Sequence, residues 1–303
     1  MAKIMAVCIS EARGTEKKNI HTAEFIENWG IKGDAHAGNW HRQVSLLSYE
    51  KIKAFQEKGA DITDGAFGEN LVVSGYDFTK FPVGTRFLCN DVILELTQIG
   101  KECHNGCAIY QRMGECIMPT NGVFAKVIKG GTISEGDVFA PMYRVAEITL
   151  SDTAAAGQRE DKSGDMVCAI AETNGFQIVS RRIIPDDEKM LTALLCELAD
   201  NNQADLILTT GGTGFSTRDN TPEATLAAIE RRADGISEAM RYRSLQVTPK
   251  GMLSRGVSGI RKKALIVNLP GSPKAVGECL EYVIGPLKHG IDILKDVTGN
   301  CAR

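Results

Sequence analysis

Glycine and threonine residues that are suited to binding phosphate follow a short apolar run near residue 206. Leu206 to Thr209 reads as a buried strand, because apolar and β-branched residues continue without a polar interruption. The residues directly behind it are Thr210, Gly211, Gly212, Thr213 and Gly214. Glycine allows positive φ and close approach of a ligand, so backbone N–H groups at such a turn can form a cradle for an anion. The stretch predicts either a phosphate site or an ordinary turn between a strand and a helix.

Two aspartates follow predicted strands and have the chemistry to bind Mg²⁺. Asp219 lies between the glycine turn and a helix that residues 220–223, Asn-Thr-Pro-Glu, can begin. Asp186 follows the end of another predicted strand, where it is either a metal ligand or the N-cap of the next helix. Paired carboxylates together with a phosphate are usual ligands of Mg²⁺. If both strands end at one edge of a sheet, Asp186 and Asp219 face one Mg²⁺ and the phosphates that it bridges.

Two more loops bring polar residues to the same predicted edge. The candidates for binding the ligand there are Ser151, Asp152, Gly271, Ser272 and Lys274. Further along the first of these loops lie residues 161–164, Asp-Lys-Ser-Gly. Most of the basic residues after position 230 are expected to be solvated, but Arg255 and Lys274 adjoin this edge and can pair with phosphates.

Strands and helices alternate from about residue 145 onwards. The predicted strands are 145–150, 176–184, 206–209 and 264–270, and the predicted helices include one ending near 174, one after 220, and 187–201, 273–283 and 286–296. This alternation is typical of an α/β domain with three layers, in which helices cover both faces of a mainly parallel sheet. Ligands bind at the carboxyl ends of the strands in such sheets, and the candidate residues fall there.

The first half of the chain has a different pattern of apolar and polar residues. Short alternating runs at 42–48, 69–75, 85–100 and 122–131 are separated by glycine and proline, and one helix is predicted at 49–59. This pattern predicts a mostly-β barrel or sandwich. We therefore expect two domains, a β-rich one over residues 1–142 and an α/β one over residues 143–303.

Three cysteines near residue 110 offer a second candidate site. Cys103, Cys107 and Cys116 are compatible with three interpretations, namely a zinc site that includes His104, buried core thiols, or a reactive thiol. Lys101 precedes Cys103, and a nearby cation lowers a thiol pKa and raises the thiolate fraction. His36 and His41 are core or surface residues or line the same pocket.

Composition excludes several classes of function. The formal net charge of −3 argues against a duplex nucleic-acid binder, which needs a basic face. No apolar run approaches the roughly 20 residues that span a bilayer, and the N-terminus lacks the apolar stretch of a signal peptide. Nine widely spread cysteines make a disulfide framework improbable. We expect a cytoplasmic protein with no membrane contact.

Several motifs in order carry a family resemblance over the second half. They are LSDTAAAG with DKSG, IIPDDEKM, TTGGTGFSTRDNTPEAT and LSRGVSGIRKKALIVNLPGSPKA. The chain resembles the molybdopterin adenylyltransferase family of molybdenum-cofactor biosynthesis from Val145 to about Asp296. The resemblance implies transfer of an adenylyl group from ATP to molybdopterin. It also implies a homotrimer and essential aspartates at Asp186 and Asp219, with the turns at 211–214 and 271–272 holding phosphate and pterin.

A second resemblance covers roughly Lys3 to Pro141. The motifs GIKGDAHAG, RQVSLLS, GAFGENLVVSG, PVGTRF and GKEC are similar to those of the MOSC domain of molybdenum-cofactor sulfurases. The resemblance implies that Cys103 carries sulfur or touches the molybdenum cofactor. Cys107 and Cys116 lie close by, so the sequence leaves open which of the three thiols reacts.

The two resemblances lead to one hypothesis. The C-terminal domain adenylylates molybdopterin with Mg²⁺ and ATP, and the N-terminal domain binds the maturing cofactor or carries sulfur to it. The partners would be proteins of molybdenum insertion and molybdoenzyme maturation. The alternative is a protein that binds or carries molybdopterin without catalysis. A nucleotide-dependent oxidoreductase is disfavoured, because no G-x-G-x-x-G follows the first strand of the α/β domain.

Overall fold

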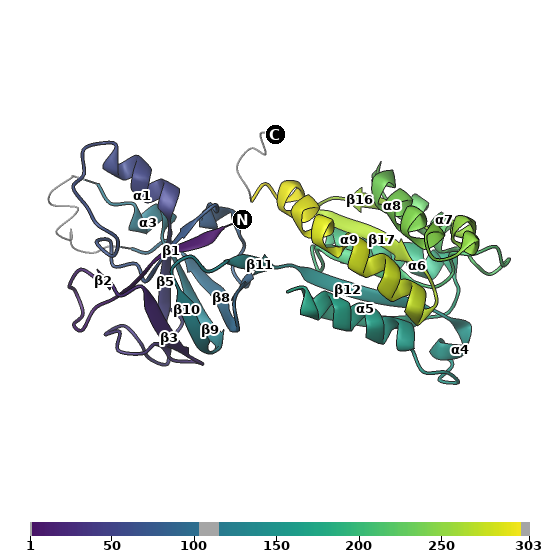
Figure 1. The fold of residues 1–303 in the computed structure, drawn as a ribbon, viewed down its shortest axis with the longest axis horizontal. Coiled ribbons are helices and arrows are strands. Elements are labelled where there is room, and N and C mark those ends of the chain that lie inside the picture. The colour runs from purple at the N-terminus through teal and green to yellow at the C-terminus, as the bar shows by residue number, and fades with distance from the viewer. Residues whose placement is uncertain (1, 103–114, 298–303) are drawn as a thin grey trace. The chain divides into compact units, whose positions relative to one another are not determined.

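The computed structural model describes residues 2–102 and 115–297, which divide into two compact units. Unit 1 comprises residues 1–142 together with the chain from Asp296 onwards, and unit 2 comprises Tyr143–Lys295 (Figure 1). After the last helix the chain returns to unit 1, because Val297 is buried in its core and the Asp296 carbonyl accepts a hydrogen bond from Lys80 Nζ at 2.9 Å.

Unit 1 is built from strands around an aromatic and aliphatic core. The strands are β1 (Lys3–Ile9), β2 (Lys18–Asn19), β3 (Thr22–Ile26), β4 (Gly30–Ile31), β5 (Val44–Ser48), β6 (Leu71–Ser74), β7 (Arg86–Cys89), β8 (Val92–Ile99), β9 (Val123–Lys129), β10 (Gly131–Ser134) and β11 (Ala140–Met142). The helices are α1 (Tyr49–Gln56), the 3₁₀ helix η1 (Phe78–Lys80) and α3 (Met118–Asn121). Among the described residues, one sheet has the order β11-β7-β8-β9-β5-β6-β1-β2 and curls around the core, and β10-β3-β4 form a second sheet (Figure 1).

Alternation of apolar residues explains these strands. In β8, Val92, Leu94 and Leu96 are buried, whereas the side chains between them are only partly covered. The run predicted at 85–100 is two strands, because Asn90 adopts a positive φ of 52° and turns the chain between β7 and β8.

Unit 2 has the three layers that the sequence predicts. Its strands are β12 (Arg144–Leu150), β13 (Gln177–Ile184), β14 (Leu206–Thr210), β15 (Arg231–Arg232), β16 (Ser258–Arg261) and β17 (Ala264–Leu269). Its helices are α4 (Asp152–Ala155), α5 (Lys162–Thr173), α6 (Glu188–Asp200), α7 (Thr221–Ala228), α8 (Asp234–Leu245), η2 (Pro249–Leu253) and α9 (Pro273–Leu294). Of the helices in the described ranges, none combines the length and the apolar character that crossing a bilayer requires.

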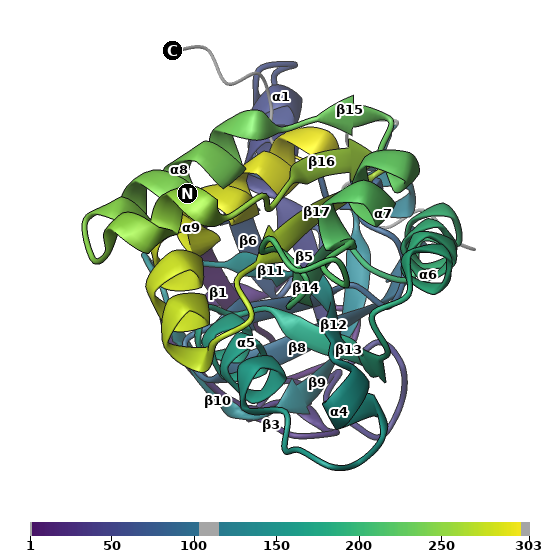
Figure 2. The same cartoon turned by 90° about the vertical axis from the view of Figure 1, so that its right-hand side faces the viewer.

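The sheet of unit 2 is mixed. Its order is β13-β12-β14-β17-β16-β15, with parallel pairs from β13 to β17 and antiparallel pairs at β16 and β15. Helices α5, α8 and α9 cover one face, and α6 and α7 cover the other (Figure 2). Successive residues of β12 serve the two faces, since Val145 packs with α5 and α9 whereas Ala146 and Ile148 pack with α6.

The two helices predicted at 273–283 and 286–296 are one helix, so this prediction was wrong. Pro286 lies inside α9 without ending it. A proline in a helix interior removes one hydrogen bond and crowds the preceding turn. The buried stripe of Leu280, Val283, Leu287 and Ile291 continues across it, and burial of that stripe offsets the local cost.

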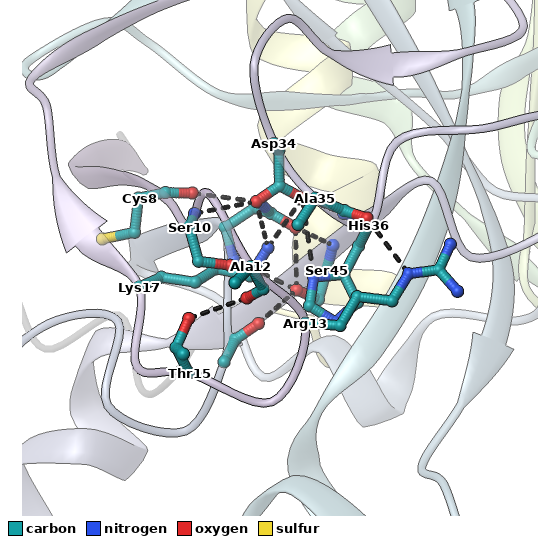
Figure 3. A network of polar contacts seen from close by, with 12 residues as sticks. Cys8, Ser10, Ala12, Arg13, Thr15, Lys17, Asp34, Ala35, His36 and Ser45 are labelled. Carbon is teal, nitrogen blue, oxygen red and sulfur yellow. Dashed lines mark hydrogen bonds and ion pairs between the residues drawn. The ribbon is translucent and has the colours of Figure 1, made fainter.

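A fully buried ion pair joins two loops of unit 1. Lys17 Nζ lies 2.6 and 2.8 Å from the two carboxylate oxygens of Asp34, and both side chains are almost completely covered. The same carboxylate accepts hydrogen bonds from the amides of Ser10 at 3.0 Å and His36 at 3.2 Å (Figure 3). These bonds, with the charge of Lys17, hold the Asp34 pKa below its ordinary value although burial alone would raise it. The pair therefore ties the 10–17 loop to the 33–36 loop.

We predict that Lys17→Met destabilises unit 1 by about 3–5 kcal/mol, because it leaves the Asp34 charge buried without its cation. Lys17→Met/Asp34→Asn should recover most of this loss. Tryptophan fluorescence during urea unfolding measures the effect in unit 1 specifically, since both tryptophans of the chain, Trp29 and Trp40, lie there. The control is Lys32→Met, which breaks the exposed pair with Glu24 and should change the unfolding midpoint little. Equal midpoints for the two single variants would contradict a stabilising role.

Candidate functional site

A pocket lies at the carboxyl edge of the parallel strands of unit 2. The loops that follow β12, β13, β14 and β17 all contribute to its lining, which includes Ser151, Asp186, Thr210, Gly211, Asp219 and Gly271. Its volume of about 220 Å³ is below the range of about 300–1,000 Å³ of sites that bury a whole small molecule. The pocket therefore suits part of a ligand, such as a phosphate group.

The glycine loop after β14 packs against the loops that follow β12 and β17. Gly211 has a φ of 98°, and a Cβ there would collide with the carbonyl oxygen of Leu150. A Cβ on Gly271 would lie 3.3 Å from the Cα of Gly211. Glycine is thus required at these positions by close backbone approach.

The carbonyl groups of this loop are all engaged. Thr221 donates from its hydroxyl to the Gly211 oxygen at 2.9 Å and from its amide to the Gly212 oxygen at 3.2 Å. Arg255 donates from its amide to the Thr213 oxygen at 2.9 Å and from Nε to the Gly214 oxygen at 2.7 Å. Within the described part of the chain, none of the amides of residues 211–214 donates a hydrogen bond. The loop therefore offers N–H groups and no free carbonyl group, which is the polarity of an anion cradle.

Arg255 holds the loop rather than standing free for a phosphate. Besides its two bonds to the loop backbone, its guanidinium contacts the Asp219 carbonyl oxygen and pairs with the Glu223 carboxylate. Three of its five N–H groups are therefore committed to the protein, and pairing of Arg255 with phosphates stays a prediction. Its donors are used to fix the strand-to-helix connection between β14 and α7.

Asp186 and Asp219 flank the cradle. A Cβ on Gly212 would lie 3.5 Å from Asp186 Oδ1, and one on Gly214 would lie 2.8 Å from Asp219 Oδ2. The Asp219 carboxylate accepts one hydrogen bond, from the Ser216 amide at 3.0 Å. Among the residues that the structure describes, neither aspartate forms an ion pair with Lys or Arg, so both keep oxygen atoms for a cation.

Asp152 braces Asp186 from the neighbouring loop. The Asp186 amide donates to Asp152 Oδ1 at 3.1 Å, and the Asp152 amide donates to Asp186 Oδ2 at 3.3 Å. Arg218 pairs with the Asp152 carboxylate at 2.7 Å. Burial raises the pKa of Asp186, and the charges of Asp152 and Asp219 raise it further. A bound cation would relieve this repulsion. The N-cap of α6 is Asp187, whose carboxylate accepts the Met190 amide at 2.8 Å, so Asp186 is not needed as a cap.

Other predicted ligand residues lie at the rim of the pocket or beyond it. The Ser151 and Ser272 hydroxyls each accept an amide, at Ala154 and Ala275, and cap α4 and α9. Ser151 lines the pocket, and Ser272 does not. The Lys274 side chain is 82% exposed and lies 3.9 Å from Glu278. The structure thus places predicted residues that follow β12, β13 and β14 in the lining of the pocket, whereas Ser272 and Lys274 lie outside it.

A charged cluster beneath the pocket escaped the sequence analysis. Asp161, which the sequence placed only in a loop, lines the pocket with its carboxylate almost covered. It accepts hydrogen bonds from Thr149 Oγ1 at 2.8 Å and from Arg181 at 2.9 Å. Glu147 lies below them in β12 with no exposed surface. The sequence held one signal for this cluster. Glu147 is a glutamate within the apolar strand VAEITL, at a position that strand periodicity places on a buried face of the sheet.

A second pocket, of about 300 Å³, lies in unit 1 above the Lys17–Asp34 pair. His36, Arg42, Lys101 and Phe124 belong to its lining. The Arg42 guanidinium lies over the rings of Trp40 and Phe124, at 5.1 and 5.5 Å, and its buried Nε has no hydrogen-bond partner among residues 2–102 and 115–297. Burial lowers the His36 pKa, and the nearby charge of Lys17 lowers it further. This pocket combines positive charge with aromatic surface.

The cysteine hypotheses fall mostly on residues outside the described ranges. Cys103, His104 and Cys107 lie there, whereas Cys116 packs beside the cluster of Phe55, Met118 and Phe124. His41 does not line the unit 1 pocket, because its ring bonds to Gln98 Oε1 at 3.0 Å on the surface. In the described residues no group of three or more His, Cys, Asp or Glu is arranged to hold a metal ion.

The arrangement in unit 2 is that of an α/β protein with an anion cradle beside two carboxylates. A family model described as a probable molybdopterin binding domain matches residues 146–289, and the MOSC domain model matches residues 33–140. The molybdopterin adenylyltransferase of Escherichia coli (strain K12) is 44% identical over 146 residues, which cover 46% of this chain and 73% of that protein. The molybdopterin adenylyltransferase of Helicobacter pylori (strain J99) is 38% identical over 155 residues, covering 50% and 86%.

A solved structure agrees with these matches. The molybdopterin biosynthesis enzyme MoaB from Thermus thermophilus has a TM-score of 0.50 and 39% sequence identity to this chain, over 52% of this chain and all of that one. The chain therefore belongs to the molybdopterin adenylyltransferase family, a family of nucleotidyltransferases, and it carries a MOSC domain as well. Both resemblances seen in the sequence are confirmed.

We predict that Gly211→Ala disorganises the cradle, because the new Cβ meets the Leu150 carbonyl and the backbone is strained as well. The expected cost is about 3 kcal/mol, against about 1 kcal/mol for Gly157→Ala, whose φ of 70° is strained but whose Cβ has open space. Hydrogen–deuterium exchange of the peptides over 206–225 measures the difference. Equal protection of these peptides in both variants would show that the close approach is not needed.

Proposed function

We propose that this protein adenylylates molybdopterin with Mg²⁺ and ATP at the pocket of unit 2. The observation that carries the proposal is the cradle of unpartnered amides at 211–214 with Asp186 and Asp219 beside it. Amides turned toward a pocket stabilise phosphate oxygens, and the carboxylates supply hard oxygen ligands that suit Mg²⁺. The names of the E. coli and H. pylori relatives support this choice of reaction.

In the proposed reaction a terminal phosphate oxygen of molybdopterin attacks the α-phosphorus of ATP. The bond from the α-phosphorus to the bridging oxygen breaks, and pyrophosphate leaves. The chain contributes position and charge: the 211–214 amides hold phosphate oxygens, and Asp152 and Arg218 keep Asp186 in place. Mg²⁺ held by Asp186 and Asp219 would neutralise phosphate charge. Ser151, Thr210, the Gly271–Ser272 turn and Lys274 remain proposed contacts for phosphate and pterin.

The proposal includes a role for unit 1 and for the assembly. The curled sheet is proposed to be a MOSC-type barrel, in a domain over residues 1–142 beside the α/β domain over 143–303. Its positively charged, aromatic-lined pocket favours a planar, phosphorylated ligand, and we assign it the maturing molybdenum cofactor. Family resemblance further supports a homotrimer that passes its product to proteins of molybdenum insertion and molybdoenzyme maturation.

Incubation of the purified protein with molybdopterin and Mg-ATP tests the reaction. We predict adenylylated molybdopterin and pyrophosphate in equal amounts, and a loss of rate of about 100-fold in Asp219→Asn and in Asp186→Asn. Asp187→Asn is the matched control, because it removes a neighbouring carboxylate that only caps α6. Binding of molybdopterin without release of pyrophosphate would contradict the proposed reaction and would indicate a carrier protein instead.

Sulfur carriage by unit 1 has its own test. We predict that Cys103 gains one sulfur atom as a persulfide on incubation with a cysteine desulfurase and cysteine, since Lys101 nearby favours the thiolate. Fragmentation of the tryptic peptides by tandem mass spectrometry locates the adduct, because Cys103 and Cys107 share the peptide 102–112. Cys116→Ala serves as the control that should keep it. An adduct confined to Cys107 or Cys116 would move the role to that thiol, and its absence from all three would leave unit 1 with cofactor binding alone.

A further inference from the structure

Glu147 is a carboxyl side chain in the middle of the sheet of unit 2. It has no exposed surface, and its cross-strand neighbours are Arg181 on β13 and Leu208 on β14. It shares a face of the sheet with Val145 and Thr149 and therefore points toward α5. A carboxyl group in such a place needs a partner or a proton.

The hydrogen bonds around Thr149 require that a carboxyl group there carries a proton. Thr149 Oγ1 lies 2.7 Å from Glu147 Oε1 and 2.8 Å from Asp161 Oδ2, yet a hydroxyl has only one hydrogen to donate. Asp161 is the ionised one, because Arg181 and the Gly164 amide also donate to it. The consistent assignment is a chain in which protonated Glu147 donates to Thr149 and Thr149 donates to Asp161.

The positive charge nearby is already committed. Arg181 bonds to Asp161 at 2.9 Å and to Asp165 at 2.7 Å, and its Nε remains 3.7 Å from Glu147 Oε2. That Glu147 oxygen has no hydrogen-bond partner in the part of the chain that the structure describes. One guanidinium, with a single positive charge, therefore faces three carboxyl groups. Two negative charges already surround it when Glu147 is neutral, and ionised Glu147 would add a third.

This chain of contacts ends at the wall of the pocket. Asp161 caps α5 through the Gly164 amide at 2.9 Å, and a Cβ on Gly164 would collide with the Asp161 carboxylate. Ser163, in the first turn of α5, donates to the Gly271 carbonyl at 2.8 Å. Residues 159–163 all line the pocket. The orientation of Asp161 thus sets where this wall stands relative to the loops after β14 and β17.

We propose that Glu147 is a positioning residue, which keeps a proton inside the sheet and through Thr149 holds Asp161 and the 159–163 wall in the form that receives the nucleotide phosphates. The assignment of the ligand rests on the proposed function. Glu147 itself touches no substrate and acts only through Thr149 and Asp161.

Titration of Glu147 makes the position of the 159–163 wall depend on pH. Burial raises the Glu147 pKa from 4.5 to about 7, the charges of Asp161 and Asp165 add to the rise, and the charge of Arg181 opposes it. Cys168 on α5 is also close enough to feel the charge of Glu147. Above this pH a third negative charge competes for Arg181, and Thr149 can serve only one of the two carboxylates. We therefore expect the wall to loosen as the pH rises through about 7.

Glu147→Gln keeps a hydrogen-bond donor at this position and removes the carboxyl group that ionises. The glutamine amide donates to Thr149 at every pH, so the variant should keep the low-pH form of the wall. For the wild type we predict that the KM for ATP rises about tenfold as the pH passes through the Glu147 pKa, with a smaller change in kcat. The KM of Glu147→Gln should stay flat. Glu172→Gln, which removes an exposed carboxylate of α5, should keep the wild-type profile. Identical profiles in wild type and Glu147→Gln would overturn the proposal.

Two further measurements need no turnover. The infrared difference spectrum of wild type minus Glu147→Gln should show the carbonyl band of a protonated carboxylic acid below about pH 7, because Glu69, whose pKa burial also raises to about 7, contributes equally to both proteins. Amide exchange of residues 159–165, corrected for its intrinsic pH dependence, should increase above that pH only in the wild type. If no variant releases pyrophosphate, the proposed function fails while these readouts still decide the role of Glu147. A missing infrared band, or exchange that is equal in both proteins, rules that role out.

Discussion

The backbone of residues 211–214 can hydrogen-bond in one direction only, and the arrangement of unit 2 follows from this constraint. Thr221 and Arg255 take the carbonyl oxygens, so the N–H groups must find acceptors outside the loop. A polar group left unpaired in a buried place costs about 1–3 kcal/mol. The loop is therefore most stable when water or an anion lies in the pocket. Strand β14, the first turn of α7 and Arg255 together make a site that is completed by its ligand.

The carboxylates beside the loop would repel the proposed anion, and this conflict is the reason that we propose a cation there. The amides at 211–214 are suited to phosphate, whereas the charges of Asp186 and Asp219 oppose it. Arg255 offers little compensation, because three of its five N–H groups hold two backbone carbonyls and Glu223. The repulsion that raises the Asp186 pKa has the same origin. The proposed divalent cation, held between carboxylate and phosphate, would be attracted to both, which neither the loop nor the aspartates achieve alone.

The sequence predicted those parts of the site that follow from local backbone conformation. It missed those that depend on contacts between side chains of different helices and strands. The glycines after Leu206–Thr210 and the strand ends at Asp186 and Asp219 follow from local chemistry, so their convergence on one edge was foreseeable. Arg255 lies far along the chain, and nothing local showed that its donors face carbonyls. The antiparallel β16 was missed because its turn at Lys262, with a φ of 51°, uses a lysine where glycine or asparagine is usual. Pro286 misled because burial along α9 outweighs its helix-breaking cost.

Both units place a buried charged group beneath a pocket, but they neutralise it differently. In unit 1 the Asp34 carboxylate has Lys17 beside it, so each charge offsets the other, although burial lowers the pKa of Lys17. In unit 2 Arg181 is shared among three carboxyl groups, and a proton on Glu147 removes one of the three negative charges. Because that proton is absent from the unfolded chain above its pKa of about 4.5, Glu147 lowers the free energy of unfolding as the pH rises from there to about 7. An apolar residue in place of Glu147 would avoid this loss of stability. The fold tolerates the loss next to Asp161, which lines the pocket. A residue retained in the core for packing alone would not need that proton, whereas one that sets the position of a ligand-binding wall does.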